Sequence, residues 1–530
     1  MSAPAPALSI FDILGPVMIG PSSSHTAGAA RIGLMGRRIL GGEPTAIELG
    51  FYGSLAKTYR GHMTDTAVVA GLLGMDVDDI GLPQALETAG TRHVSVAIRT
   101  QTMSDKNPNT IELTVQSHSE SRQIVGISVG GGEIVMTAID DHAVRLDGKH
   151  EVVLVFAERG RNIQDGIGRV LGGTLTSCEV VPGAVEDLAI LTSDTVLPLD
   201  VEARLETLPG GRGVRRLPRL YAYATRDPEP LFGSVAEMLA RCRTNAMNVP
   251  EAVIAYEAKR SGLDDRAIRR MLERIWRVMQ DAIVRGLRGE NRLVGGLMDG
   301  KDASRLLAAI ESGRTVSGPV LPVAVARALA SMEVNAAMGC VVAAPTAGSC
   351  GVLPGLVSAL AEQRGATSSE IADALLVGAI YGVLIARVAP VSGALGGCQS
   401  EIGVASAMAA AACAQLGGGT PEHTAQAMAL ALKSVLGMAC DPVAGPVEVP
   451  CIKRNAIGVA NALAAADMAL AGIESIVPPD EVILALRNVQ TLMPMELRDT
   501  TLGGLGITPT AKRLTEQWMT RCGVRRMDSA

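Results

Sequence analysis

The chain has 530 residues, enough for about three domains of average size. Its formal net charge of −6 and the absence of a basic cluster exclude the long-range attraction on which nucleic-acid binding depends. Nine cysteines are too sparse for a secreted disulfide scaffold, and no basic segment followed by an apolar one opens the chain. We therefore expect a cytoplasmic protein with reduced thiols.

The hydropathy pattern also argues against a membrane partner. Mean hydropathy is +0.27, but it comes mainly from alanine, valine and glycine. The longest strongly apolar run, ALLVGAIYGVLIA from Ala374, is shorter than the roughly 20 residues that a membrane span needs. The run predicts a helix buried inside a soluble bundle.

The first 150 residues or so have the pattern of an α/β (α+β) domain. Short runs rich in Val, Ile and Thr are interrupted by Gly, Pro and Asp, with helical stretches between them. This alternation of strand-like runs and helical stretches continues to about residue 228. The runs that predict strands are TAIELGFYGS, VSVAIRT, TIELTVQS, GISVGGGEIVMTAI and EVVLVFAER.

A second, smaller module is predicted between His150 and about Leu220. Its runs follow one another in the order strand, helix, strand, strand, helix, strand, which is the ferredoxin-like split motif. Small modules of this kind commonly bind regulatory ligands or form dimers. The linker that follows is predicted around Asp227 to Gly233.

Beyond this linker nearly every segment predicts helix. Apolar residues recur at helical spacing, and the later segments are apolar on most faces, which indicates burial among other helices. The predicted organisation is therefore multidomain: an α/β domain over residues 1–149, a βαββαβ module over 150–226, and a mostly α-helical domain over 227–530.

Three cysteines of the helical part, Cys398, Cys440 and Cys451, lie beside glycine, proline or another small residue. A metal or cluster held by three protein sulfurs keeps one coordination position for a substrate. The alternative is that each is a core residue, because free cysteine is among the most buried residue types. Four others, Cys178, Cys242, Cys340 and Cys413, fit that alternative better.

Two further segments carry candidate site residues. In GPSSSHTAGAARIG, from Gly20 to Gly33, hydroxyl groups precede a predicted helix, where free backbone N–H groups suit a carboxylate or phosphate. The alternative is a helix cap with spare serines. In YRGHMTD, His62 has the pKa range of a proton acceptor near neutral pH, although a lone histidine is more often structural.

At this point the motifs resemble a known family. IFDILGPVMIGPSSSHTAGAARIG and FYGSLAKTYRGHMTDTAVVAGLLG look like the β part of the iron–sulfur-dependent L-serine dehydratases (L-serine ammonia-lyases). EVNAAMGCVVAAPTAGSCGVLPG, GALGGCQSEIGVASAMAAAA and the segment from LGMACDPVAG to ADMALAGI look like the α part. The resemblance runs from about Ser9 to Thr510 and suggests a single-chain fusion of the two parts.

The resemblance implies a cofactor and a reaction. In that family, cysteines at the positions of Cys398, Cys440 and Cys451 hold a four-iron four-sulfur cluster, and the intervals of 42 and 11 residues agree with the family pattern. The implied activity is conversion of L-serine to pyruvate and ammonia, with an iron acting as Lewis acid on the departing hydroxyl. The module over 150–226 resembles the family's ACT-type regulatory module. Because such modules can pair, we expect the protein to form a homodimer.

Residue roles follow from the same resemblance. His62 is expected to take the Cα proton, with His25 as second choice. Substrate-binding residues are expected to be Ser22, Ser23, Ser24 and Thr26 of the serine-rich loop, together with Lys453, Arg454 and Asn455 shortly after Cys451. For Lys453 and Arg454, an exposed helix start is the alternative.

Two positions depart from the family pattern. Related sequences commonly carry histidine where this chain has Asn107, so a role of that side chain in proton transfer is missing or has moved. Some relatives use a C-terminal cysteine as a removable fourth ligand, and Cys522 is the candidate here.

Two other classes of protein remain open at this stage. One is a serine-sensing regulatory protein without turnover, which the change at Asn107 leaves open. The other is a zinc-dependent lyase that uses the same thiols. A pyridoxal-phosphate enzyme is disfavoured, because no lysine lies in a Schiff-base context with a glycine-rich phosphate loop beside it.

Overall fold

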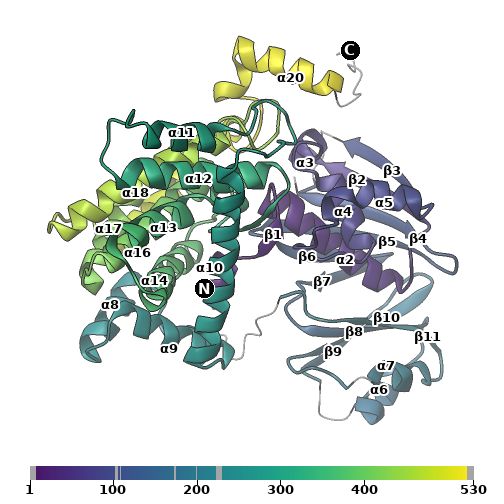
Figure 1. Cartoon of the computed structure of the whole chain (residues 1–530). Helices are drawn as coiled ribbons and strands as arrows, with labels where there is room; N and C mark the ends of the chain where they lie inside the picture. Colours follow the sequence, from purple (N-terminus) through teal and green to yellow (C-terminus); the bar gives the residue numbers. More distant parts are fainter. Residues whose placement is uncertain are drawn as a thin grey trace. The chain divides into compact units, whose positions relative to one another are not determined.

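The computed structural model describes residues 8–101, 106–107, 109–171, 175–198, 200–221 and 229–521. The chain divides into two compact units (Figure 1). We call the first the helical unit; it comprises Met1–Ser23, Arg60–His62 and Asp227–Ala530. The second, the strand-rich unit, comprises Ser24–Tyr59 and Met63–Arg226. The prediction of a strand-rich N-terminal part and a mostly helical C-terminal part is confirmed.

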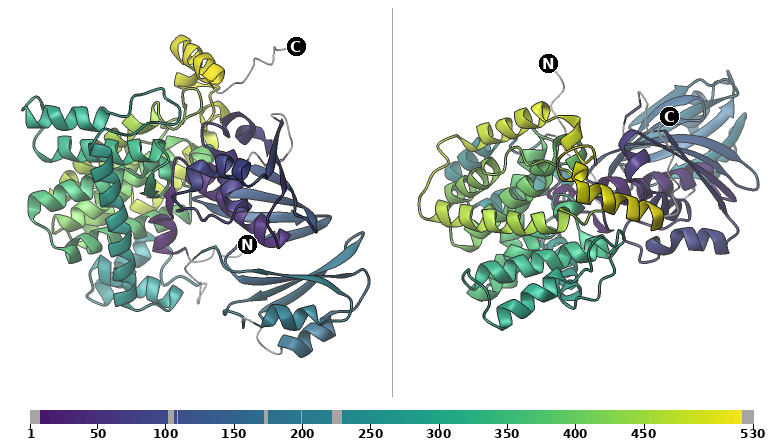
Figure 2. Two further views of the ribbon diagram at one scale, coloured as in Figure 1. Left: turned by 45° about the vertical axis from the view of Figure 1, so that its right-hand side comes forward. Right: turned by 90° about the horizontal axis from the view of Figure 1, so that it is seen from above.

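The helical unit is a bundle of long helices, drawn from teal to yellow (Figure 1, Figure 2). Helix α16 packs against α13, α14, α17 and α18. Its alanine-rich sequence explains this position, because small side chains allow backbones to approach closely on every face. The helices are α8 (Val235–Thr244), α9 (Val249–Ser261), α10 (Asp265–Leu287), α11 (Asp302–Glu311), α12 (Val320–Ala336), α13 (Val352–Arg364), α14 (Ser368–Ala386), α15 (Gly393–Gly396), α16 (Val404–Leu416), α17 (Pro421–Lys433), α18 (Cys451–Leu470), α19 (Pro479–Leu492) and α20 (Pro509–Arg521).

The apolar run that begins at Ala374 lies in α14, whose start is fixed by a reciprocal capping box between Thr367 and Glu370. This helix is long and apolar enough to cross a membrane, but 72% of its most apolar window is buried inside the protein. The burial is that of a core helix packed among its neighbours, as the sequence predicts.

The N-terminal residues belong to the helical unit because they are tied into it. Strand β1 (Val17–Ile19) pairs antiparallel with β12 (Cys340–Val342). The short helix α1 (Ile10–Ile13) begins where the buried Glu257 carboxylate accepts hydrogen bonds from the Ser9 hydroxyl (3.0 Å) and the Ile10 N–H (3.1 Å). Arg260 neutralises that carboxylate at 2.6 Å. A buried carboxylate is tolerated only when it is paired in this way.

The larger sheet of the strand-rich unit has six strands in the order β3-β2-β4-β5-β6-β7, and only the β2–β3 pair is parallel. Helices α2 and α4 pack together at Gly33 and Gly71, where a Cβ would lie about 2 Å from a carbonyl oxygen of the facing helix. The elements are α2 (Gly28–Leu40), β2 (Ala46–Tyr52), α3 (Gly53–Thr58), α4 (Thr64–Leu72), α5 (Ala85–Thr91), β3 (Ser95–Gln101), β4 (Thr110–Gln116), β5 (Ser121–Gly130), β6 (Glu133–Ile139) and β7 (His142–Leu146).

The smaller sheet of this unit is antiparallel, with the strand order β11-β8-β10-β9. Its hydrophobic core joins the sheet to its two helices through residues such as Val155, Ile167, Leu191 and Leu205. In chain order the elements are β8 (Glu151–Glu158), α6 (Gln164–Leu171), β9 (Ser177–Val181), β10 (Glu186–Ser193), α7 (Val201–Glu206) and β11 (Gly211–Leu217).

Candidate functional site

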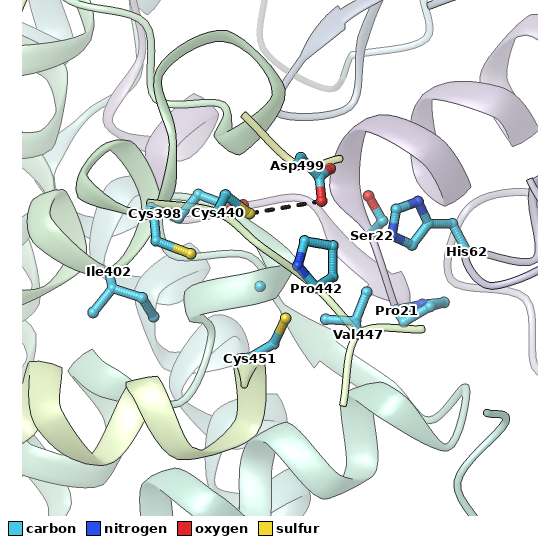
Figure 3. Close-up of a pocket in the computed structure, with 12 residues that line it drawn as sticks. Pro21, Ser22, His62, Cys398, Ile402, Cys440, Pro442, Val447, Cys451 and Asp499 are labelled. Carbon is cyan, nitrogen blue, oxygen red and sulfur yellow. Dashed lines mark hydrogen bonds between the residues drawn. The ribbon is translucent and has the colours of Figure 1, made fainter. Parts of the chain in front are cut away.

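One pocket of the helical unit contains all three of the singled-out cysteines (Figure 3). Segments far apart in the sequence form its wall, from the N-terminal residues to the segment after α19. The lining residues are Pro21, Ser22, His62, Gly348, Cys398, Glu401, Ile402, Cys440, Pro442, Val447, Cys451 and Asp499.

Each cysteine is held by a different kind of backbone. Cys398 follows Gly397, which adopts a positive φ of 76°, and precedes the π-helical turn that leads into α16. Cys440 lies in an irregular segment that forms an isolated bridge with Arg498. Cys451 is the first residue of α18, where the helix dipole favours a negatively charged sulfur. The fold thus brings three sulfurs from separate elements to one cavity.

The pocket places these thiols close to one another. The Sγ atoms of Cys398 and Cys440 and a carboxylate oxygen of Glu401 lie within 4.8 Å of one another. The neighbouring Cys398 sulfur and burial raise the pKa of Cys440 well above its usual range. Burial and the same sulfur raise the pKa of Cys451. Thiolates packed this closely need a cation to balance their charge, which is the chemistry of a metal-ligand set.

The other described cysteines do not line this pocket. Cys413 is buried within α16. Cys350 is also buried and lies two residues before the start of α13. Burial alone is the main cause that raises the pKa of each of these two thiols. They have the character of core residues, in contrast to the trio. Cys522 lies outside the described residues.

Glu401 is a pocket residue that the sequence analysis did not single out. Its buried carboxylate accepts a hydrogen bond from the Thr346 hydroxyl at 2.7 Å. Burial, with a contribution from the negative charge of Asp499, raises the pKa of Glu401 to about 7. The signal was available, since Glu401 lies three residues after Cys398 in the quoted motif GGCQSEIG. A metal site formed from cysteine and glutamate side chains is compatible with this grouping.

The three predicted substrate-binding residues Lys453, Arg454 and Asn455 have different surroundings. Arg454 donates to the Cys398 sulfur (3.4 Å), the Ala439 carbonyl (2.7 Å) and the Asp441 carboxylate (2.7 Å). Burial opposes its charge, but Cys398 and Asp441 together raise its pKa. Asn455 is fully buried, and its amide group bonds to the Gly348 carbonyl and the Gly351 N–H. Neither residue lines the pocket directly; both support residues that do.

Lys453 projects away from this group. Its ammonium lies 3.1 Å from the Asp302 carboxylate, and its side chain is 60% exposed. Lys453 is not among the residues that line the pocket. Successive side chains of a helix point to different faces, so Lys453 and Arg454 of α18 have different neighbours.

This contrast predicts different stabilities for two neighbouring substitutions. Arg454→Met is expected to lower the free energy of unfolding by about 3–5 kcal/mol, because it leaves the buried Asp441 carboxylate without its cation. Lys453→Met removes a mostly exposed ammonium, and Asp302 keeps Arg305 as a second cation (3.4 Å), so this change should cost about 1 kcal/mol or less. Denaturant titration of the two variants beside the parent protein measures the difference. Equal losses would contradict this account.

The loop between Cys440 and Cys451 is anchored by residues that do not line the pocket. The Glu448 carboxylate accepts hydrogen bonds from the N–H groups of Leu297 (2.8 Å) and Met298 (3.1 Å). Helix α20 covers the same loop, with Trp518 packed in a small core that includes Val443. Two residues of the loop, Pro442 and Val447, line the pocket. The anchoring therefore fixes the spacing between two of the three sulfurs.

His62 and Ser22 complete the pocket from the N-terminal segments of the helical unit (Figure 3). His62 is 2% exposed, so bulk water has little access to its ring. Gly61 packs directly on the cysteine loop: a Cβ there would lie 2.8 Å from the Gly445 carbonyl carbon. Ser23 is buried but does not line the pocket. The serine-rich loop and YRGH motif thus contribute one hydroxyl and one imidazole.

We expect Gly61→Ala to lower kcat/KM by about 10- to 100-fold, because the added methyl forces the His62 segment away from the loop that carries the cysteines. The matched control is Gly90→Ala in α5, where a Cβ meets open space and activity should be unchanged. Steady-state rates of both variants, with circular dichroism to verify folding, provide the check. Parent-like activity of Gly61→Ala would rule out the close packing.

The remaining predicted loop residues lie in the strand-rich unit. His25 is buried, with its Nε2 atom 3.2 Å from the Asn109 side-chain oxygen. The carbonyl of Ser24 accepts a hydrogen bond from the Ser128 hydroxyl, and Thr26 is fully buried. Asn107, at the position that departs from the family pattern, is exposed, and its side chain accepts the N–H of Asn109 at 2.9 Å. Asn107 therefore shapes the turn that presents Asn109 to His25.

Buried thiols, an imidazole and carboxylates grouped in one pocket, on a helical unit fused to a strand-rich one, define an enzyme-type site. Comparison with known proteins agrees with this class. The family model described as "Serine dehydratase alpha chain" matches residues 244–506, and the one described as "Serine dehydratase beta chain" matches residues 9–94.

Relatives with both parts in one polypeptide match along nearly the whole chain. L-serine dehydratase TdcG of Escherichia coli is 32% identical over 515 residues, covering 94% of this chain and 99% of the relative. L-serine dehydratase 2 of the same organism is 30% identical over 511 residues, covering 94% and 98%. The probable L-serine dehydratase alpha chain of Bacillus subtilis is 45% identical over 287 residues, covering 54% and 95%. The chain belongs to the L-serine dehydratase family of lyases, with beta-chain and alpha-chain regions fused.

Proposed function

We propose that this chain converts L-serine to pyruvate and ammonia. The observation that carries the proposal is the convergence of Cys398, Cys440 and Cys451 on one pocket that also contains His62. Family membership supports the reaction, and the pocket supplies groups suited to it. A water-excluded site with a proton acceptor and a metal-ligand set meets the two needs of the elimination: removal of the Cα proton and release of a poor leaving group.

The cofactor we propose is a four-iron four-sulfur cluster held by the three cysteines. The donor set fits it, because three sulfurs satisfy three irons and leave the fourth for another ligand. The cluster, when bound, supplies a Lewis acid near the substrate hydroxyl and carboxylate. Arg454 supports the site by offsetting negative charge at the Cys398 sulfur, which it contacts at 3.4 Å. Cys522 stays a proposal as a removable fourth ligand.

His62 is the proposed base. Its buried ring lines the same pocket as the cysteines, so a serine held there would present its Cα–H bond inside the cavity. Loss of the Cα proton and of the Cβ hydroxyl yields an enamine, which tautomerises to an imine and hydrolyses to pyruvate and ammonia. Ser22 is proposed to orient the substrate carboxylate; Ser23, Ser24 and Thr26 are proposed to shape that loop. His25 remains the second candidate for the base.

The domain roles are proposed in the same way. We assign residues 1–149 as a serine dehydratase β-type domain, 150–226 as an ACT-like regulatory module and 227–530 as the catalytic domain. The antiparallel order β11-β8-β10-β9 with two helices supports the ACT-like assignment. Its edge strands β9 and β11 suit pairing in a homodimer. A cytoplasmic location agrees with the free state of the described cysteines.

The test is to purify the full chain without oxygen and to measure iron, acid-labile sulfide, zinc and pyruvate formation from L-serine. About four irons and four sulfides per chain, with turnover that requires them, support the proposal. A colourless zinc protein with turnover would favour a zinc-dependent lyase. Serine binding without pyruvate would favour a regulatory protein. Parallel assays with L-threonine define the substrate preference.

A further inference from the structure

Asp499 is a pocket residue for which neither the sequence motifs nor the proposed mechanism gives a role. Its backbone has a positive φ of 56°, a left-handed conformation that is uncommon for any residue except glycine. Two backbone hydrogen bonds hold it there: the Cys440 N–H donates to the Leu497 carbonyl (2.8 Å), and the Asp499 N–H donates to the Cys440 carbonyl (2.9 Å). Strained backbone that is fixed by its surroundings is typical of functional positions.

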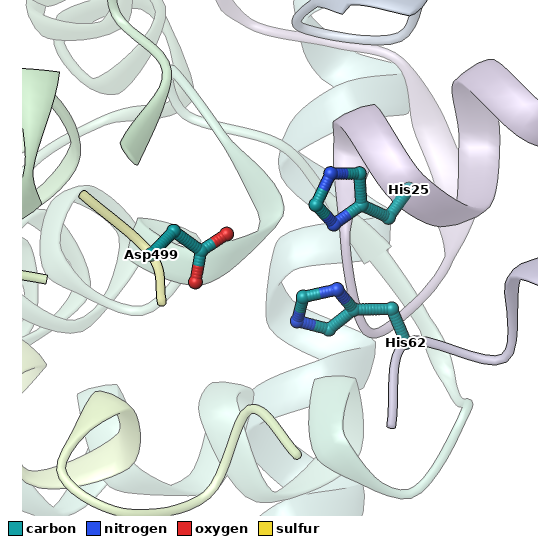
Figure 4. Close-up of side chains that lie close together, drawn as sticks. All are labelled: His25, His62 and Asp499. Atoms are coloured by element: carbon teal, nitrogen blue, oxygen red, sulfur yellow. The ribbon is translucent and has the colours of Figure 1, made fainter. Parts of the chain in front are cut away.

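The Asp499 carboxylate points toward the imidazole ring of His62 (Figure 4), and both residues line the pocket. A carboxylate oxygen of Asp499 and a ring nitrogen of His62 lie within 4.8 Å of each other. Both belong to the helical unit. A hydrogen bond between them needs about 2.7–3.2 Å, so the two groups are near neighbours that must approach further to form one.

The other carboxylates near the pocket have different partners. Glu401 is grouped with the sulfurs of Cys398 and Cys440 and accepts from Thr346. Asp441 does not line the pocket; it accepts from Arg454 and from the Leu505 N–H (2.7 Å). Of the acidic residues that line the described pocket, Asp499 is therefore the one grouped with the imidazole.

The Asp499 carboxylate has two polar neighbours in the pocket. The Cys440 Sγ donates to one of its oxygens at 3.6 Å. A carboxylate offers two oxygens with about four acceptor sites, so it can accept from Cys440 and from a second donor at the same time. The neighbouring His62 ring offers that second donor.

We propose that Asp499 is a positioning residue for His62: its carboxylate accepts one ring N–H and so leaves the other ring nitrogen unprotonated toward the substrate. This inference rests on the proposed function and deepens it. A base held by a third group in one tautomer is a general arrangement for imidazole catalysis. In the step itself, the Cα–H electron pair forms the Cα=Cβ bond, the proton goes to the free nitrogen of His62, and the Cβ–O pair leaves with the oxygen.

The first test compares Asp499→Asn and Asp499→Glu with the parent protein after cluster loading. We expect Asp499→Asn to lower kcat about 10²-fold, with KM within threefold and iron and sulfide content unchanged. Asp499→Glu should recover part of kcat, because a longer carboxylate can still accept the N–H. The control is Glu496→Gln, an exposed residue of the same segment, which should behave as the parent.

Each contrary result has a defined meaning. Loss of iron from Asp499→Asn would make Asp499 a metal ligand and overturn the proposal. A raised KM with unchanged kcat would make it a substrate-ammonium contact and also overturn it.

The second test does not depend on turnover. Long-range 15N–1H correlation spectra of histidine-labelled, cluster-free protein report the tautomer of His62, assigned by loss of its signal in His62→Gln. We expect a single tautomer in the parent and a mixture in Asp499→Asn. Identical spectra would overturn the proposal even if the parent makes pyruvate. If the parent makes none, the proposed function fails, and the spectra still decide whether the two residues are coupled.

Discussion

Cys440→Ala is expected to abolish cluster assembly and to lower pyruvate formation at least about 10³-fold. The variant removes one of three sulfurs from the pocket, and the Lewis acid it helps to hold contributes several kcal/mol to the elimination, at about 1.4 kcal/mol for each factor of ten. Cys398→Ala and Cys451→Ala should behave alike. The measurements are iron and sulfide content, visible absorption and initial rates under anoxic conditions.

The matched control is Cys413→Ala. Cys413 is buried, as Cys398 and Cys440 are, but it lies within the alanine-rich helix α16 and does not line the pocket. This variant should keep its iron and its kcat. If it lost the cluster as completely as Cys440→Ala, the effect would reflect the removal of any buried cysteine, and the three sulfurs would have no special role.

His62→Gln should lower kcat by about 10²- to 10⁴-fold while the cluster content stays that of the parent. Glutamine is similar in size and can hydrogen-bond, but it cannot accept a proton near neutral pH. The expected result is a lower kcat with an unchanged visible absorption of the cluster. Rates and absorption are therefore measured on the same samples.

His25→Gln separates the two candidate bases. Since His25 is paired with the Asn109 side chain in the strand-rich unit, we expect a smaller loss than for His62→Gln. His423→Gln is the neutral control, because His423 serves in a helix cap far along the chain. A larger loss for His25→Gln than for His62→Gln would transfer the role of base to His25.

Much of the architecture follows from local sequence pattern. The strand runs such as TAIELGFYGS and EVVLVFAER alternate or concentrate β-branched residues, and they became β2 and β8. The run from Ala374 became the buried helix α14. The short strands β1 and β12 were not anticipated. Each has three residues, too few for a periodic pattern, and each exists because the other is available to pair with it.

Some residues of the candidate site could be found from sequence motifs, and others only from the structure. Cys398, Cys440, Cys451 and His62 were found from motifs, because chemistry-bearing residue types beside glycine stand out in a sequence. Glu401 and Asp499 were missed, because acidic residues are common and only burial or backbone strain sets these two apart. The substrate contact of Lys453 stays a prediction: Lys453 pairs with Asp302, whereas its neighbour Arg454 donates to the Cys398 sulfur.

The sequence by itself determined which part of the chain is strand-rich, which part is helical and to which family the chain belongs, and it singled out the cysteines as candidate metal ligands. Local propensity, periodicity and long motifs carry that information. The tertiary structure alone decided which of those residues meet. Three sulfurs, an imidazole and two carboxylates from positions 62 to 499 share one cavity, because the packing of whole helices and loops sets the distances between side chains. No spacing along the chain encodes those distances.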